Sequence, residues 1–373
     1  MSVCIKEVKT NSDIKKFVKF QFELYKGDKF WVPPMINDEE KILKAESNPA
    51  FEFCDVKLLL AYKNNKCVGR ICAIINHPYN EIHGAKFGRF SRLEFVDDKE
   101  VTKALLEEAI SWFKEKGMEH IHGPLGFTNL DNQGMLIEGF DYLPAVASVY
   151  HKAYYKEHLD ELGFGKENDW VEFRLTIGEN ASKKASRGAS LIMKRYGFKL
   201  IESKSKKDIR PYAETMFRIL NKAFLELPYV VPLSDELIAQ YVKKYIGILD
   251  HKYVKFVTKD DKLIGFFIGM PSLSEAMQKA KGKLLPFGIF PIMRAMKNPA
   301  NIDMLLTGVL PEYQSSGVAV VLIAELQKSM LANGIDILET TGVFETNANV
   351  IANWKNYEHI QHKRRRCWVK EIR

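Results

Sequence analysis

The sequence predicts an α/β (α+β) protein in which two domains of the same plan are fused. The chain has 373 residues, which is long for one core and natural for two domains of under about two hundred residues each. Short β-rich runs alternate with amphipathic helical patterns, as in α/β proteins. The order of these patterns in the first half returns in the second half, which indicates an internal duplication.

The duplication begins with a strand, a polar turn and a helix in each half. Asp13-Ile14 follows IKEVKTNS near the start, and Asp208-Ile209 follows LIESKSKK near the middle. Two hairpins come next, at 61–75 and 257–270, each with a polar turn of the kind that joins paired strands. The matching order favours a true repeat over a chance likeness of two α/β segments.

Glycines occupy equivalent places in the two halves. Gly69 and Gly265 fall at the same point of the second hairpin strand. The helical patterns VTKALLEEAISWFKEKG and VAVVLIAELQKSMLANG follow, and each closes on a glycine, Gly117 or Gly334, a typical helix stop. The polar stretch GENASKKASR lacks an apolar period. We therefore expect domains at 1–178 and 198–373, joined by a linker region at 179–197.

Composition excludes several classes of protein. Hydrophobic residues make up 46% and charged residues 27%, no apolar run is long enough for a membrane span, and no signal peptide is visible. The five cysteines are scattered, so we expect reduced thiols in a cytoplasmic protein. His120 and His122 have no third ligand nearby in sequence, so we expect no metal. The net charge of +8 attracts anions in general, and no nucleic-acid-binding signature accompanies it.

The sharpest local signal is LLTGVLPEYQSSGVAVVLIAEL, at 305–326. An apolar strand ends near Val309, and Pro311 stops it because proline cannot donate to a sheet ladder. A helix then opens within the loop Gln314, Ser315, Ser316, Gly317, Val318 and Ala319. Small residues let an anion approach the unpaired N–H groups of a helix start. The pattern therefore predicts an anion cradle.

VLPEYQSSGVA resembles motif A of the GNAT acyltransferase superfamily, in which a strand ending in V-x-P precedes a glycine-containing loop and a long helix. The resemblance implies two GNAT-like domains, each a mixed, mostly antiparallel sheet flanked by helices. It also implies acetyl-CoA or another acyl-CoA as co-substrate: Gln314 through Ala319 would hold the diphosphate, and Val309 would pair with the pantetheine arm. Gln314 replaces the commoner arginine, and Ala319 replaces the commoner glycine.

The first half departs from this motif. Asp97, Asp98, Lys99 and Glu100 stand where the loop should be, with no glycine. Three carboxylates would repel a diphosphate and cap the helix themselves, so we expect a degenerate GNAT-like domain. Its YYKEHLDELGF resembles the motif B helix. With FWVPPMINDEE and NPAFEF, the segment before it resembles a little-characterised bacterial family of tandem GNAT-like proteins.

The resemblance also suggests residues on the acceptor side. Asn347 or Asn349 would contact the cofactor, and Tyr357 is the candidate general acid, although it lies about a turn beyond Trp354, where the tyrosine is expected. Glu339 and Glu345 are candidates to take a proton from an amine through water. The alternatives are a packed core tyrosine and a helix-start carboxylate.

The predicted function is N-acyl transfer to a small-molecule or peptide amine. A non-catalytic CoA sensor or scaffold stays open, as does aminoacyl transfer of the tandem-GNAT type, against which the good diphosphate loop counts. We expect no nucleic-acid partner and no stable membrane insertion, and we leave a homodimer open. The apolar, proline-containing segment 283–299 would be a pocket wall, a lid, or a patch that meets the first domain or a membrane, with burial between the domains as the default.

Overall fold

The computed structural model describes residues 2–373, with all their side chains except those of Asn349, Lys355 and Asn356. The chain divides into two compact units. Unit 1 comprises Met1–Val171, Ser274–Ile292 and His362–Arg373, and unit 2 comprises Glu172–Leu273 and Met293–Gln361.

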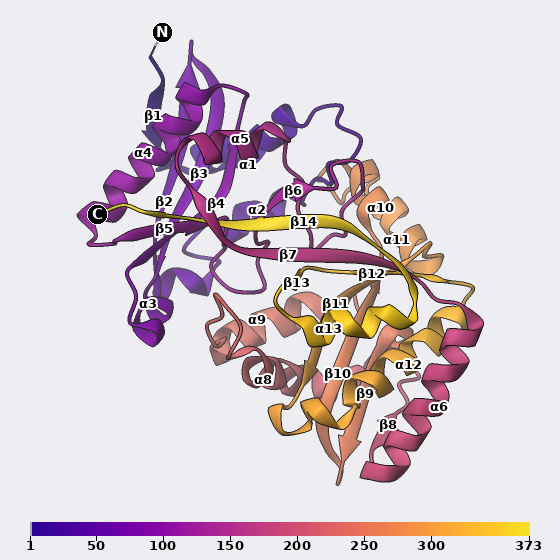
Figure 1. Cartoon of the computed structure of the whole chain (residues 1–373). Helices are drawn as coiled ribbons and strands as arrows, with labels where there is room; N and C mark the ends of the chain where they lie inside the picture. Colours follow the sequence, from indigo (N-terminus) through magenta and orange to yellow (C-terminus); the bar gives the residue numbers. More distant parts are fainter. Residues whose placement is uncertain (1) are drawn as a thin grey trace. The chain divides into compact units, whose positions relative to one another are not determined.

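Unit 1 is built on a sheet with the strand order β1-β2-β3-β4-β5-β14 (Figure 1). All neighbours are antiparallel except β4 and β5, which are parallel. The strands are β1 (Cys4–Glu7), β2 (Cys54–Lys63), β3 (Lys66–Asn76), β4 (Phe87–Phe95), β5 (His120–Gly123) and β14 (Glu358–Glu371), with the short β6 (Met135–Glu138) on β14. The helical segments are α1 (Asn11–Leu24), α2 (Ile36–Ile42), η1 (Pro49–Glu52), α3 (His77–His83), α4 (Lys99–Glu115), α5 (Tyr154–Glu161) and α10 (Ser274–Ala280).

Helices cover both faces of the unit 1 sheet. Alternate residues of β2 and β3 point to opposite faces, as the period of a strand requires. Ile71 and Ala73 pack with Leu105 of α4, whereas Cys72 packs with Phe17 of α1. The two faces therefore have separate apolar cores.

Unit 2 repeats the plan with the strand order β8-β9-β10-β11-β12-β7. As in unit 1, one pair of neighbours is parallel, here β11 and β12, and the other pairs in this order are antiparallel. The strands are β7 (Gly165–Thr176, shared with unit 1), β8 (Lys199–Ile201), β9 (Val254–Lys259), β10 (Lys262–Pro271), β11 (Ile302–Val309), β12 (Ile337–Thr340) and β13 (Val343–Phe344). The helical segments are α6 (Glu179–Tyr196), α7 (Lys206–Ile209), η2 (Arg210–Tyr212), α8 (Ala213–Phe224), α9 (Asp235–Tyr245), η3 (His251–Tyr253), α11 (Ile289–Lys297, shared with unit 1), η4 (Pro311–Ser316), α12 (Val318–Ala332), α13 (Ala348–Ala352) and η5 (Asn353–Asn356).

The predicted equivalence of the halves is confirmed in detail. Both hairpin turns have two residues with positive φ, Asn64-Asn65 and Asp260-Asp261, as a type I′ turn requires. A Cβ on Gly69 would lie 2.7 Å from Leu105 of α4, and a Cβ on Gly265 would lie 2.7 Å from Val318 of α12. In each unit, the glycine thus allows the following helix to approach the sheet closely.

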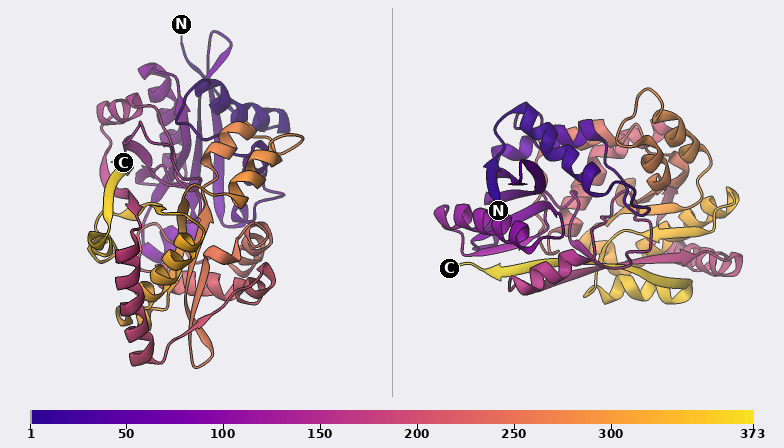
Figure 2. Two further views of the ribbon diagram at one scale, coloured as in Figure 1. Left: turned by 90° about the vertical axis from the view of Figure 1, so that its right-hand side faces the viewer. Right: turned by 90° about the horizontal axis from the view of Figure 1, so that it is seen from above.

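Two expectations about the chain's organisation are wrong. The stretch 179–197, expected as a linker, forms α6, which lies beside α12 (Figures 1 and 2). Its alanines, lysines and arginines favour a helix, which Gly197 then ends. The predicted boundary at 178 also misses the exchange of segments, since His362–Arg373 and Ser274–Ile292 belong to unit 1. A local sequence pattern cannot report which distant strand supplies a neighbour.

The apolar segment 283–299 also differs from expectation. It holds no long helix, as its prolines predict, but Leu285 is 73% exposed and Phe287 is 77% exposed. Burial as the default is therefore wrong for these side chains. Among the described residues, none of the helices has the length and apolar character needed to cross a bilayer.

Candidate functional site

The predicted cradle in unit 2 is a tight turn between β11 and α12. Strand β11 ends at Val309, η4 follows, and Gly317 has φ of 82° and ψ of 15°. This left-handed conformation favours glycine, which explains the residue at this position. The helix begins at Val318, a few residues later than the sequence suggested, because Pro311–Ser316 first form a 3-10 turn.

The start of α12 offers backbone donors to an anion. No side chain caps this helix end, because glycine at the cap position has none to offer. Gln314 and Ser315 are exposed, and Gly317 is partly exposed. The first N–H groups of a helix lack intrahelical acceptors and lie at the positive end of the dipole. The turn therefore has the backbone features of an anion-binding helix start.

The neighbouring strands of unit 2 separate where the turn begins. The parallel register joins only Ile302–Met304 of β11 to Leu338–Thr340 of β12. Beyond Met304, β11 runs past the end of β12 towards Val309. A strand edge without a paired strand presents amide groups for an extended ligand.

Val309 carries the last of these edge groups. Leu310 N donates to Ile264 O on β10 at 2.9 Å, so the N–H of Val309 points to the opposite side by the alternation of a strand. The Gln314 side chain donates to Val309 O at 3.3 Å. The structure thus places Val309 and Gln314 in contact beside the turn at Gly317, while the predicted pantetheine and diphosphate contacts stay predictions.

In unit 1, side chains satisfy the equivalent strand edge. Phe95 pairs with Gly69 as Val309 pairs with Gly265. Phe95 N donates to Tyr155 Oη at 3.1 Å, and Tyr154 Oη donates to Phe95 O at 2.6 Å. Tyr155 Oη also donates to Glu94 at 2.7 Å, and burial raises the pKa of this carboxyl. Both tyrosines come from α5, so this helix closes the strand edge in unit 1 that corresponds to Val309 in unit 2.

The start of α4 in unit 1 is capped, as its carboxylates predict. Asp98 accepts a hydrogen bond from Glu100 N at 3.0 Å. Lys63 Nζ lies 2.7 Å from Asp98 and 3.0 Å from Glu100, and its hydrogen bond lowers the pKa of Asp98. This helix end is closed to an added anion.

The acceptor-side candidates are more dispersed. Asn347 caps α13 by accepting from Val350 N at 3.3 Å, whereas the side chain of Asn349 lies outside the described residues. Tyr357 Oη accepts from Gln327 Nε2 at 2.8 Å. Gln327 is nine residues into α12, about 13 Å along the helix from its start. Tyr357 therefore does not lie at the cradle itself.

The two carboxylate candidates differ in environment. Glu339 is buried and accepts from Arg174 Nε at 2.8 Å and NH2 at 2.6 Å. This ion pair makes it a structural group of β12 more than a base. Glu345 is half-buried and follows β13, close to the start of α13, so it is the better placed of the two to exchange protons with solvent.

One neighbour of the turn, on α6, could not be predicted from the local sequence. A Cβ on Gly317 would lie 2.8 Å from Cδ1 of Ile192 on α6. Ile192 was overlooked because α6 was taken for a linker. Its apolar contact to Gly317 fixes the turn from the side of the missing Cβ.

His122 acquires neighbours that its sequence context did not show. Its Nδ1 lies 3.2 Å from Glu167, and Cys367 Sγ donates to the same carboxylate at 3.2 Å. Burial lowers the pKa of His122. The three groups come from β5, β7 and β14, and their ligand atoms all lie within 4.8 Å of one another; the expected absence of a metal therefore stays a prediction.

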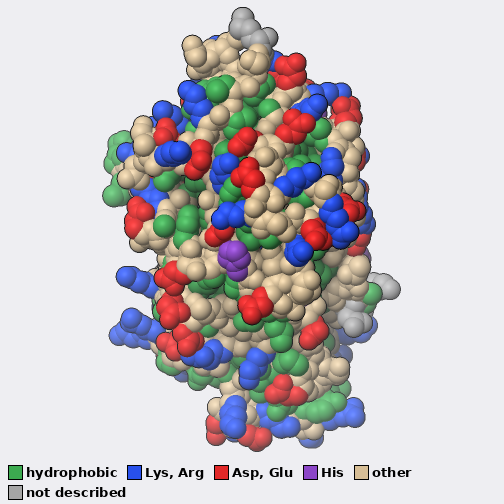
Figure 3. Space-filling view, turned by 90° about the vertical axis from the view of Figure 1, so that its left-hand side faces the viewer, with side chains coloured by type: hydrophobic (Ala, Val, Ile, Leu, Met, Phe, Trp, Pro, Cys, Tyr) green, Lys and Arg blue, Asp and Glu red, His purple; other side chains and the backbone are tan. Residues whose placement is uncertain are grey.

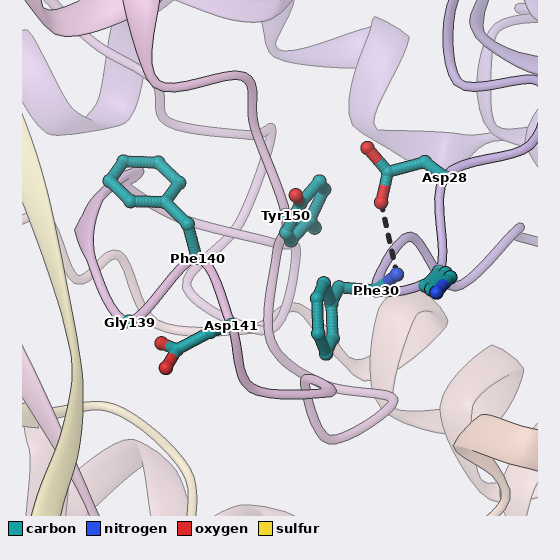
Figure 4. Close-up of a pocket in the computed structure, with 7 residues that line it drawn as sticks. Asp28, Phe30, Gly139, Phe140, Asp141 and Tyr150 are labelled. Atoms are coloured by element: carbon teal, nitrogen blue, oxygen red, sulfur yellow. Dashed lines mark hydrogen bonds between the residues drawn. The ribbon is translucent and has the colours of Figure 1, made fainter.

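Unit 1 has an open hollow of about 530 Å³ between two loops (Figure 4). Phe30, Phe140 and Tyr150 give it an aromatic lining. Two acids, Asp28 and Asp141, also line it. Asp28 accepts from Phe30 N at 3.0 Å and pairs with Lys152 at 2.7 Å, so this carboxylate is already held by partners of the protein.

Two known proteins are similar to this chain in sequence over most of its length. No family model matches the chain. The protein YghO of Escherichia coli K12 is 27% identical over 371 residues, which cover 97% of this chain and 93% of that protein. The bacterial ceramide synthase of Caulobacter vibrioides is 26% identical over 318 residues, 83% of this chain and 81% of that protein.

Solved structures show a similar arrangement. A tandem GNAT protein from the clavulanic acid biosynthesis pathway aligns with a TM-score of 0.57 at 12% identity, over 100% of this chain and 99% of that one. An N-acetyltransferase of the same superfamily from Sphaerobacter thermophilus gives 0.53 at 9% identity, over 100% and 96%. Together with the two matching sheets, these alignments show that the chain has the tandem GNAT fold.

Proposed function

We propose that the protein is an acyl-CoA-dependent N-acyltransferase that binds its co-substrate in unit 2. The observation that carries the proposal is the uncapped start of α12 at Gly317, directly after a strand edge at Val309. The amides from Ser315 to Ala319 would hold the diphosphate, and Val309 would pair with the pantetheine arm. Asn347 and Asn349 are proposed as further cofactor contacts.

The proposed acceptor is a long-chain amine. A ceramide is a fatty acyl amide of a long-chain amino alcohol, and a relative matching 83% of this chain is named a ceramide synthase. The proposal therefore narrows the amine to a lipid amine. No disulfide joins any of the five cysteines, all of which lie among the described residues, in keeping with a reducing, cytoplasmic compartment.

In the proposed reaction, the amine nitrogen attacks the thioester carbonyl. A C–N bond forms and the C–S bond breaks, while the nitrogen loses a proton and the departing thiolate gains one. We assign the first proton to Glu345 and the second to Tyr357, whose hydroxyl accepts from Gln327 and keeps its own proton to donate. If so, Tyr357→Phe lowers kcat roughly a hundredfold and leaves the Kd for acyl-CoA unchanged.

Calorimetry with acetyl-CoA and a long-chain acyl-CoA tests the cradle. Ser315→Asp adds one negative charge on an exposed side chain, and we expect affinity to fall at least about tenfold. Ser190→Asp, on an exposed position of α6, is the control and should bind as the wild type does. A wild type that binds neither ligand refutes the proposal, and equal binding by Ser315→Asp places the site elsewhere.

Thiol release separates an enzyme from a sensor. We expect turnover with a long-chain amino alcohol and little with short amines. If acyl-CoA binds but no amine on the panel is acylated, the protein is a CoA-binding sensor or scaffold instead.

A further inference from the structure

The loop after α10 exposes a group of large apolar side chains. Leu284 is 46% exposed, Leu285 73% and Phe287 77%, and Phe290, in the first turn of α11, is 62% exposed; we call these four residues the apolar loop. It projects from the segment that joins α10 to α11, in both views of Figure 2. Isolated exposed leucines are common on proteins, but a contiguous apolar group usually marks an interaction site.

Hydrogen bonds of α10 and Gly282 with other segments of unit 1 hold the backbone that precedes the apolar loop. Ser274 Oγ donates to Pro144 O at 2.6 Å, and Ile36 N donates to Gly282 O at 2.9 Å. Gln278 Nε2 donates to Lys29 O at 2.8 Å and to Trp31 O at 3.0 Å. All these contacts lie within unit 1. The apolar side chains therefore point outward from a fixed backbone.

Basic residues flank the apolar loop on both sides in sequence. The stretch 274–298 has one acidic residue, Glu275, and five basic ones: Lys279, Lys281, Lys283, Arg294 and Lys297. On the face drawn in Figure 3, by contrast, acidic and basic side chains are interspersed. An apolar tip between cations fits the boundary of an anionic bilayer, where apolar groups enter the acyl region and lysines meet phosphates.

A hollow of about 530 Å³ adjoins the base of this loop. Its lining includes Phe30, Leu143, Gln278 and Lys281, so it combines apolar surface with a cation. Such a lining is compatible with a lipid chain and headgroup at the foot of the loop.

We propose that the apolar loop docks unit 1 on the surface of a membrane rich in anionic phospholipid. Leu285, Phe287 and Phe290 enter the headgroup–acyl boundary, and the flanking lysines contact lipid phosphates. The docking is peripheral, in keeping with the absence of a spanning helix among the described residues. It does not depend on the proposed transferase function.

Co-sedimentation with vesicles tests this proposal. Full-length protein should pellet with phosphatidylglycerol–phosphatidylcholine vesicles and much less with phosphatidylcholine alone. L285D/F287D should lose at least tenfold in apparent affinity. The double variant with Lys281→Gln and Lys283→Gln should have an apparent vesicle affinity that is roughly fivefold lower for each lysine removed. Added salt should reduce vesicle binding by the wild type.

The control is Leu191→Asp, because Leu191 on α6 is 71% exposed, which matches Leu285. It should pellet as the wild type does. Acetyl-CoA calorimetry and thermal melting of L285D/F287D should match the wild type, which separates lost docking from lost folding and from failure of the transferase proposal. Wild type that stays in the supernatant, or L285D/F287D that still pellets, overturns the proposal. A wild-type dimer that L285D/F287D makes monomeric, without vesicle binding, would assign the loop to self-association.

Discussion

Helices α4 and α12 begin at the same place in the two units, but their N-terminal backbone groups are satisfied differently. In unit 1, Asp98 caps the helix, and tyrosines of α5 bond both the N–H and the C=O of Phe95. In unit 2, Gly317 leaves the helix without a side-chain cap, and the N–H of Val309 points away from β10. The same fold therefore satisfies a helix-start donor with its own side chain in unit 1 and leaves the helix start without a side-chain cap in unit 2, where we propose the ligand site.

Matched substitutions at Gly69 and Gly265 test the difference between the two units with the largest expected effects. A Cβ at either glycine would lie 2.7 Å from a buried side chain of the following helix. We expect Gly69→Val and Gly265→Val each to lower the free energy of unfolding by about 2–3 kcal/mol. Only Gly265→Val should also weaken acetyl-CoA binding, by at least about tenfold, because it moves the start of α12.

Urea denaturation and calorimetry on both variants give the two readouts. Gly178→Val is a suitable control, because no atom lies within 4 Å of its added Cβ. Equal loss of acetyl-CoA binding in Gly69→Val and Gly265→Val would contradict a ligand site confined to unit 2.

Tyr155→Phe tests whether side chains truly close unit 1. The change leaves Phe95 N and the buried Glu94 without this hydroxyl. We expect a loss of about 2 kcal/mol in the free energy of unfolding, since a buried polar group loses its partner, and no change in the Kd for acetyl-CoA. Tyr154→Phe, at a more exposed tyrosine, should cost less. A measurable gain of a second acetyl-CoA site in either variant would show that unit 1 keeps a latent cradle.

Acidification should act on unit 1 through His151. This buried ring accepts from Leu136 N at 3.1 Å, and burial lowers its pKa to about 3. In the unfolded chain this histidine binds a proton near pH 6.5, whereas in the folded chain it stays neutral until about pH 3. Its contribution to the free energy of unfolding is therefore fully present above pH 6.5. It falls by up to about 1.4 kcal/mol per pH unit as the pH drops from 6.5 towards 3.

Hydrogen exchange at pH 7 and pH 5 locates this effect. Amides of β6 should lose protection at pH 5 in the wild type, and less so in His151→Gln, which keeps an acceptor without titrating there. His83→Gln, at an exposed histidine, should behave like the wild type. An unchanged profile in His151→Gln would rule out His151 as the source of the acid sensitivity.

Local signals in the sequence were sufficient to predict the repeat and the strand, turn and helix around Gly317. The paired turn residues, Gly69 and Gly265, and the Val309–Gly317 stretch all act within a few positions of the chain. Local signals could not predict contacts between segments that are far apart in the sequence. Nothing near Phe95 reveals that Tyr155, sixty residues later, satisfies its amide. Likewise, β14 gives no local indication that its end pairs with β5 in unit 1.

The smallest expected effect concerns the cap that distinguishes α4 from α12. Asp98→Ala removes the side chain that accepts from Glu100 N and pairs with Lys63. We expect a loss of about 1 kcal/mol in the free energy of unfolding at pH 7. Because the pKa of Asp98 is lowered in the folded protein, its contribution is present above the ordinary pKa of about 3.9 and disappears as the pH falls below it. The wild type and Asp98→Ala should therefore converge in acid, whereas a constant difference down to pH 3 would mean that the carboxylate charge is not what stabilises the start of α4.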